Sequence, residues 1–339
     1  MKRICLFILL ATASLSASAQ PTWYKINKEF ITTHLPSDSA IGNLEANAVS
    51  PAKTVHPVSC GGKDGELHIG IAGGDIVWSN TGQPISALAD QENSDFGVVA
   101  EPVNLAPATK TAAFALAGQA ATFQGYYRLW NEGHDHGSTA ASNPDHVLEL
   151  HPAWGFHGGA HDFDDPASIR PMQAKKGGSA FRGYGASKFR TLLSTLSHEE
   201  WLHVYEDDSS VFVELPLASN FFQLPVKVNE VHDVTGGVEA SVDVFSNEAH
   251  DNLVLSGLRV VANSGSRIAQ RLKAHEDIQY LLGIFSVNLR KVTEIAAGHD
   301  GADKAVFAPS ALEFFTYGVP LAKAVASSSP TCTDEPAPD

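Results

Sequence analysis

Histidine and acidic side chains gather in one stretch of this 339-residue chain, between Phe123 and Asp165. Six of the fifteen histidines lie there, interleaved with aspartate and glutamate. Imidazole nitrogens and carboxylate oxygens are the donors with which proteins hold divalent cations and move protons. Metal binding or acid–base catalysis is therefore predicted first in this part of the sequence.

The candidate metal ligands form two groups within this stretch. His134 and His136 make an H-x-H pair around Asp135, in a segment of turn-forming composition. Farther along, period-two alternation predicts a strand with Glu149 and His151 on one face. The full predicted set of metal ligands is His134, Asp135, His136, His151, His157, His161 and Asp162. Zinc favours the histidines and calcium the carboxylates, so the ion could be either.

Glu149 is the candidate catalytic residue, as a general base toward a water bound to the cation. Its structural alternative is a buried pair with His151, in which each side chain satisfies the other. Three aromatic side chains could stack on a sugar or another planar ligand, although aromatic side chains on strands are more often part of a core. These candidate ligand-binding residues are Tyr126, Trp130 and Trp154.

The first nineteen residues have the pattern of a secretory signal peptide. Lys2 and Arg3 precede a short apolar run, and small residues follow up to Ala19. No apolar run is long enough to span a membrane, so we expect a secreted or periplasmic protein with no membrane partner. In that oxidising compartment Cys60 and Cys332 could form one disulfide or remain as two thiols.

A formal net charge of −15 argues against nucleic acid as a partner. Binding to a phosphate backbone depends on clustered Lys and Arg, and the sequence has no such cluster. A small neutral molecule or an oligosaccharide suits an acidic surface better than a polyanion does. The H-E-x-x-H zinc motif is missing as well, because His198 and His203 are five residues apart rather than four.

Short strands are predicted to position these residues. The chain alternates apolar and polar residues at 66–71, and further short strands are predicted at 96–103, 122–131 and 146–156. Several short strands without a long helical period predict a small barrel or sandwich. Beyond a Gly-rich connection, further strands and hairpins predict a second β-rich domain. One amphipathic helix is expected from about Ser266 to Ile284, with Ser266 as its N-cap.

The segments KDGELHIGI, GVVAEPVN, TFQGYYRLWN and HVLELHPAWGF occur in this order between Thr54 and Phe156. Their order resembles that of uncharacterised secreted bacterial OB-fold-like proteins, in which a KDG-x-L-H strand is followed by a closing strand that ends in E-L-H-P. The matching residues are Lys63 to His68 and Glu149 to Pro152. The resemblance implies a five-stranded barrel whose faces and loops bind a ligand. The long loop from Glu132 to Asp145 departs from the pattern.

The predicted fold is mainly β: an N-terminal OB-like five-stranded barrel and a second β-rich domain with one amphipathic helix. Its expected parts are a signal peptide (1–19), an extended lead-in (20–53), the barrel (54–160), a Gly-rich linker (161–187), an α+β domain (188–323) and a disordered tail (324–339). Two functions fit this organisation. One is a secreted metal-assisted hydrolase of a small neutral ester or lactone. The other is a non-catalytic extracellular binding module for an oligosaccharide, peptide or protein partner.

Overall fold

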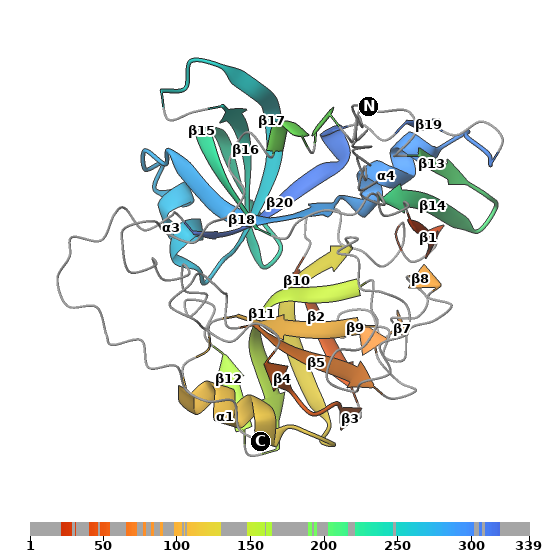
Figure 1. The fold of residues 1–339 in the computed structure, drawn as a ribbon, viewed down its shortest axis with the longest axis vertical. Helices are drawn as coiled ribbons and strands as arrows, with labels where there is room; N and C mark the ends of the chain where they lie inside the picture. The colour runs from red at the N-terminus through yellow and green to blue at the C-terminus, as the bar shows by residue number, and fades with distance from the viewer. Residues whose placement is uncertain are drawn as a thin grey trace, which may run out of the picture.

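Strands dominate the protein, and the predicted mainly β fold with an OB-like five-stranded barrel is confirmed (Figure 1). The architecture comes from a computed structural model. It describes residues 22–28, 31, 41–46, 48–54, 66–72, 77–78, 83–84, 89–90, 98–103, 105, 107–129, 148–159, 161–164, 189–191, 193–194, 203–215, 221–246, 249–301, 305–306 and 309–318. The predicted signal peptide, Cys60, Cys332 and the tail lie outside these residues.

The first barrel is built from strands of residues 41–158. They are β2 (Ile41–Ala46), β3 (Ala48–Val49), β5 (Leu67–Ala72), β9 (Val98–Pro102), β10 (Ala121–Leu129) and β11 (Leu148–Gly158). The strands β2 and β3 are one residue apart; β2 pairs with β10 and β3 with β5. Strand β5 pairs antiparallel with β9, β9 pairs in parallel with β11, and β11 pairs antiparallel with β10. If β2 and β3 are counted as one strand, the chain order of the five strands around the sheet is 1-2-3-5-4, because β11 lies between β9 and β10. This is the strand order of an OB-like barrel.

The first barrel begins earlier in the chain than the sequence predicted. Residues 20–53 were expected to be an extended lead-in, but they contain β1 (Thr22–Asn27), β2, β3 and the start of β4 (Lys53–Thr54). The strands β2 and β3 lack the alternation of apolar side chains that marks a half-buried strand. Pairing with β5 and β10 fixes them instead, and such long-range pairing leaves little trace in local sequence.

The second barrel is closed and repeats the same topology. Its strands are β15 (Phe221–Val234), β16 (Gly237–Phe245), β17 (Leu253–Asn263), β18 (Tyr280–Val287) and β20 (Leu312–Gly318), in the order β15-β16-β17-β20-β18. Its third and fifth strands, β17 and β20, are again parallel. A helix joins the third strand to the fourth in both barrels: α1 (Pro107–Ala115) in the first and α3 (Arg267–Lys273) in the second. The chain is therefore a tandem of two OB-like barrels.

The helix predicted for Ser266 to Ile284 is shorter than expected. Ser266 is the N-cap, and its hydroxyl accepts a hydrogen bond from the amide of Ala269. The helix α3 ends at Lys273, and the apolar residues from Leu281 onward are in strand β18, where they line the barrel. A second helix, α4 (Leu289–Ala296), then joins β18 to the short helix η4 (Pro309–Ala311) and β20.

A smaller sheet lies beside the two barrels, at the right of Figure 1. Its strand order is β19 (Ala305–Val306), β13 (His203–Glu206), β14 (Ser210–Leu215), β1 and β8 (Ala89–Asp90). Strands β13 and β14 form a hairpin around residues 207–210. Four short strands extend the first barrel's sheet: β6 (Val77–Trp78), β7 (Gln83–Pro84), β12 (His161–Asp164) and β4, which pairs with β5.

An apolar cluster with a hydrogen-bonded tyrosine at its centre joins the two barrels. Ile41, Tyr126 and Trp154 of the first barrel form one buried cluster with residues of the second: Val261, Leu282, Ile284 and Phe315. The Tyr126 ring stacks on Phe315 at 4.9 Å and meets Trp154 edge-on at 4.8 Å. Its hydroxyl accepts a hydrogen bond from the Asn263 amide at 2.6 Å and burial raises its pKa, so the group is a neutral phenol.

Gly125 lies at an irregular point in the pairing of β10 with β11, where a side chain has no room. A Cβ added there would lie 2.8 Å from the carbonyl oxygen of Pro152 and 3.0 Å from Cα of Ala153, both backbone atoms. We expect Gly125→Ala to cost about 1–3 kcal/mol, as overpacking does. Gly301→Ala is the control, because its added Cβ meets Tyr205 only at ordinary contact distance. Chemical unfolding measures both; equal stabilities would contradict the assigned register.

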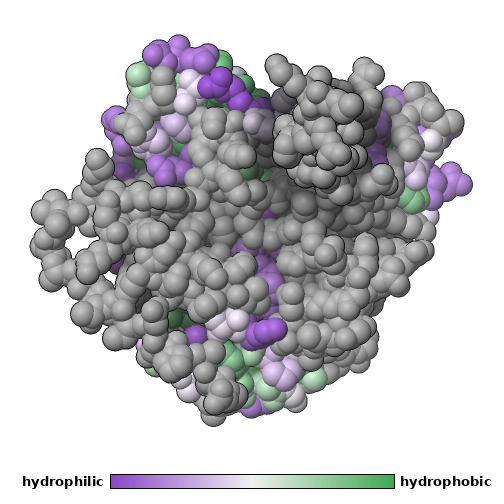
Figure 2. All heavy atoms as spheres, in the orientation of Figure 1, coloured by the Kyte–Doolittle hydropathy of each residue, from purple (hydrophilic) through white to green (hydrophobic). Residues whose placement is uncertain are grey.

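In Figure 2, hydrophilic residues gather at the end of the second barrel that β15, β16 and β17 form. Within the described part of the chain, no helix combines the length and the apolar character needed to cross a membrane.

Candidate metal centre

Strand register brings a set of ionisable side chains together on the outer face of the first barrel. In β5, Leu67 and Ile69 point into the apolar core, so Glu66 and His68 point to the opposite face. The β5–β9 register pairs Ile69 with Ala100, and one step further it brings Glu101 beside His68. Two residues far apart in sequence thus become neighbours because the strands pair in this register.

The neighbouring strands complete the same set. In the parallel β9–β11 ladder Leu150 lies beside Ala100, which brings His151 next to Glu101. In the β10–β11 ladder Arg128 lies opposite Glu149. All six residues are at most 2% exposed: Glu66, His68, Glu101, Arg128, Glu149 and His151. We call this set the Glu/His cluster. Buried charges are costly unless they are paired or bind a metal, so it requires a compensating arrangement.

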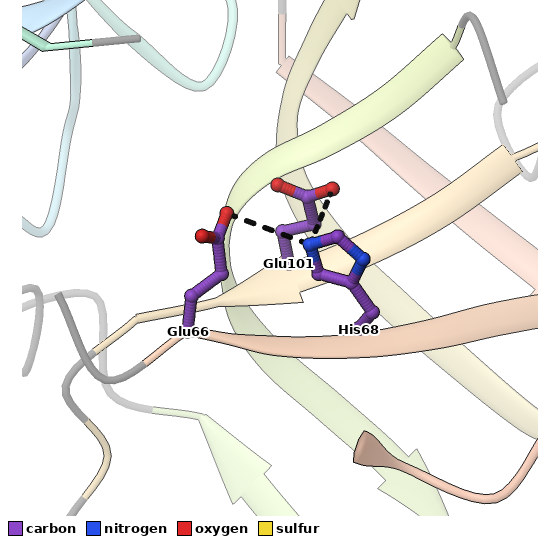
Figure 3. A group of neighbouring side chains, drawn as sticks. All are labelled: Glu66, His68 and Glu101. Carbon is purple, nitrogen blue, oxygen red and sulfur yellow. Dashed lines mark ion pairs between the residues drawn. The ribbon is translucent and has the colours of Figure 1, made fainter. Parts of the chain in front are cut away.

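Glu66, His68 and Glu101 converge on one point (Figure 3). The Nε2 atom of His68 lies 3.3 Å from Oε1 of Glu101 and 3.8 Å from Oε1 of Glu66. All three ligand atoms lie within 4.8 Å of one another, so these residues could hold a metal ion. Donors about 2 Å from a shared zinc ion stand at such separations after small side-chain adjustments.

A second group shares Glu101. The Nδ1 atom of His151 lies 2.8 Å from Oε2 of Glu101 and 3.2 Å from Oε2 of Glu149. Glu101, Glu149 and His151 therefore also meet the spacing for a metal ion. Glu101 thus has one carboxylate oxygen near His68 and the other near His151.

Arg128 places a permanent positive charge in the cluster. Its Nη1 atom donates to Oε2 of Glu149 at 2.9 Å, and its Nε atom donates to the carbonyl oxygen of Phe285 at 2.7 Å. Phe285 is in β18, so this guanidinium also links the cluster to the second barrel. Glu149 is therefore engaged by both Arg128 and His151, which is unfavourable for a general base acting on an external substrate.

The imidazole of His151 is held in its protonated form. Burial alone would lower its pKa, but the carboxylates of Glu101, Glu149 and Glu66 outweigh burial and raise the pKa well above the ordinary value of 6.5. A cation bound at Glu101 and Glu149 would have to displace this proton, since a ligand nitrogen must be unprotonated.

We expect the metal-free protein to lose stability as pH rises above 6.5. A folded pKa above the unfolded value means that the stabilisation from His151 is complete below pH 6.5 and is lost as pH rises through the folded pKa. Chemical unfolding at pH 6 and pH 9 in the presence of a chelator measures the effect. In His151→Gln this loss should be smaller; an equal loss in both proteins would show that other groups cause it.

The structure separates the residues that the sequence proposed as ligands. His151 and Glu149 are in the cluster, whereas His157 is exposed on β11. The backbone of His161 and Asp162 is in β12, paired with His157 and Gly158, beyond the end of the cluster. His134, Asp135, His136 and Trp130 lie outside the described residues. The predicted set is therefore only partly brought together.

The proposed aromatic ligand site needs correction. Tyr126 is 0% exposed and Trp154 is 1% exposed, because both pack against the second barrel. The Trp154 indole donates its hydrogen bond to Gln124 within the first barrel. They therefore do not offer an open face on which a ligand could stack, and the alternative of a core role is the one observed.

Four members of the cluster were missed from sequence. Glu66 and His68 were noted only as part of a strand, and Glu101 and Arg128 were not singled out. A local signal did exist: each of the four is a charged or polar residue that directly neighbours a buried apolar residue in the chain. That signal marks a second buried face, but it does not show which strands become neighbours.

Compared with known proteins, the chain matches no family model, no curated protein and no solved structure. The resemblance to secreted OB-fold-like proteins stays a prediction, and the geometry of the Glu/His cluster is the main indication of function.

Proposed function

We propose that this protein binds a divalent cation in the first barrel, through Glu66, His68 and Glu101, and acts as a metal-stabilised extracellular binding module. The convergence of these three buried donors is the observation that carries the proposal. Two carboxylates and one imidazole form a ligand set suited to zinc and to other divalent ions. The signal-peptide pattern supports secretion or a periplasmic location.

Burial and connectivity support a stabilising role for the ion. The donors are at most 2% exposed, and the cluster continues through Glu149 and Arg128 to the backbone of the second barrel. A cation held there offsets carboxylate repulsion inside the protein. The OB-like topology supports a binding role only by analogy, since such barrels often bind oligosaccharides or other polymers.

Metal-assisted hydrolysis of a neutral ester or lactone is the second candidate function. One observation favours it: three protein ligands leave coordination positions for water, as in catalytic zinc sites. Glu149 is disfavoured as its general base because Arg128 and His151 engage it, so Glu66 or Glu101 would have to bind the water's proton.

Metal content and turnover, measured on one preparation, test both candidates. We expect about one Zn²⁺ or other divalent ion per chain by mass spectrometry after dialysis, and a lower thermal midpoint after chelation. Ion present at a hundred times its Kd stabilises a protein by about 2.7 kcal/mol. Oligosaccharide and peptide binding should then be weaker in the chelated protein.

Three outcomes decide the matter. Absence of bound ion, with no thermal shift on adding Zn²⁺, Ca²⁺ or Mn²⁺, rejects the metal centre. Hydrolysis of chromogenic esters or lactones that disappears with chelator and returns with metal favours the hydrolase. Bound metal without turnover across the panel favours the binding module.

A further inference from the structure

We infer that the imidazole of His151 supplies a fourth ligand to the cation proposed in the first barrel, through its Nε2 atom. Glu149 is then a positioning residue, which holds that ring without binding the ion. This inference deepens the proposed function and rests on it. It makes the metal centre a closed site with four protein ligands, which is the structural rather than the catalytic arrangement.

Four donor atoms follow one another at separations that suit a shared ion. The Oε1 atom of Glu101 lies 3.3 Å from Nε2 of His68, and that nitrogen lies 3.8 Å from Oε1 of Glu66. The Nε2 atom of His151 lies 3.7 Å from the same Glu66 oxygen. Ligand atoms about 2 Å from a tetrahedral zinc ion are about 3.3 Å apart. Small side-chain adjustments would therefore place all four atoms around one ion.

The two ring nitrogens of His151 face different partners. Its Nδ1 atom lies 3.2 Å from Oε2 of Glu149 and 2.8 Å from Oε2 of Glu101, whereas Nε2 lies 3.7 Å from Oε1 of Glu66. A histidine that binds a metal usually donates its other ring N–H to a carboxylate, which fixes the tautomer and the orientation of the ring. With Nδ1 donating to Glu149, Nε2 is the nitrogen that meets the ion.

Arg128 keeps Glu149 in this outer role. Its Nη1 atom donates to Oε2 of Glu149 at 2.9 Å, and its Nε atom donates to the carbonyl oxygen of Phe285 in the second barrel. The same Glu149 oxygen therefore contacts a permanent cation and the His151 ring. Turning this carboxylate toward an ion would break a buried ion pair, which is strongly unfavourable.

Burial favours a protein group over water as the fourth ligand. Glu66, His68, Glu101 and His151 are all at most 2% exposed. A catalytic zinc site keeps one position open to water and substrate, whereas a structural site takes all four ligands from the protein. The burial of these residues fits the structural kind, and with it the binding module rather than the hydrolase.

X-ray absorption at the zinc edge tests the inference by counting the imidazoles bound to the ion. We expect two in the Zn²⁺-loaded parent protein, from His68 and His151. His151→Gln should retain one imidazole and bind Zn²⁺ more than about 100-fold more weakly, because a direct ligand is lost. Glu149→Gln should keep both imidazoles and lose about 10–100-fold in affinity, as the loss of an outer partner does. Titration calorimetry measures the affinities, and circular dichroism checks folding.

His203→Gln is the matched control. His203 is also a histidine paired with a carboxylate, since its Nδ1 atom lies 2.7 Å from Oε2 of Glu214 in the smaller sheet. Replacing it should change neither the affinity for Zn²⁺ nor the number of bound imidazoles. The control therefore separates the loss of a ligand from the loss of any histidine–glutamate pair.

The outcomes separate this inference from the proposed function. No ion in the parent protein removes the metal site itself. An ion with one imidazole in the parent protein, or unchanged affinity in folded His151→Gln, overturns the fourth ligand and leaves the metal site in place. Unchanged affinity in Glu149→Gln overturns the positioning role of Glu149.

Should His151→Gln fail to fold, cadmium NMR of the parent protein decides. Coupling between the bound cadmium nucleus and the ring protons of His151 is expected for a direct ligand. Its absence, with cadmium bound, overturns the assignment of His151.

Discussion

Replacing Glu101 with Gln should abolish cation binding in the Glu/His cluster. The carboxylate of Glu101 lies 3.3 Å from His68 and 2.8 Å from His151, closer to both imidazoles than Glu66, which lies 3.8 Å and 3.7 Å from them. We expect affinity for Zn²⁺ to fall by more than about 100-fold, since loss of a direct ligand exceeds the effect of losing an outer partner. The metal-free protein should also lose about 3–5 kcal/mol of stability, because the substitution leaves buried groups of the cluster uncompensated.

Two controls make the Glu101 result specific. Glu313→Gln removes a buried carboxylate from the second barrel, where Arg259 is its partner. It should destabilise the protein without changing metal content. The double replacement of His134 and His136 with Ala should leave the ion bound if the cluster is the site. Loss of the ion in that variant, with Glu101→Gln unaffected, would place the site among the histidines that the sequence suggested first.

Replacing Trp154 with Ala should separate the effects of the interface from those of the metal. The indole is 1% exposed and packs on Tyr126 at the contact between the barrels. Truncating a buried aromatic side chain costs about 3–5 kcal/mol, so we expect a loss of that size in chemical unfolding. Metal stoichiometry should stay unchanged, since Trp154 is not a donor.

Tyr126→Phe and Leu253→Ala calibrate this loss. Removing only the Tyr126 hydroxyl leaves the Asn263 amide without that acceptor and should cost about 1–3 kcal/mol. Leu253 is 52% exposed, and its truncation should be close to neutral. If Trp154→Ala is as mild as Leu253→Ala, the barrels do not pack through this cluster.

The sequence predicted the class of fold because alternation is a local property. The strand at Leu67, Ile69 and Ile71 was recognised from its period of two, and Ser266 from its position ahead of a helical pattern. The helix after Ser266 was predicted too long, because apolar residues from Leu281 onward also suit a strand that lines a barrel. Local pattern does not distinguish those two structures; closure of the barrel does.

Glu149 and His151 could be chosen from sequence because residues two positions apart on one strand lie on the same face. Their partners could not be chosen in this way. Glu66, Glu101 and Arg128 come from three other strands, and only the registers of β5, β9, β10 and β11 bring them together.

By itself, the sequence determined a mainly β chain with acidic composition, a concentration of histidine and carboxylate, and one strand that carries part of a site. The tertiary structure decided that two OB-like barrels follow one another, that Tyr126 and Trp154 join them, and that the Glu/His cluster contains Arg128. The physical reason is that alternation and capping act between residues close in the chain. A metal centre depends on distances of a few ångströms between strands, which register and packing alone determine.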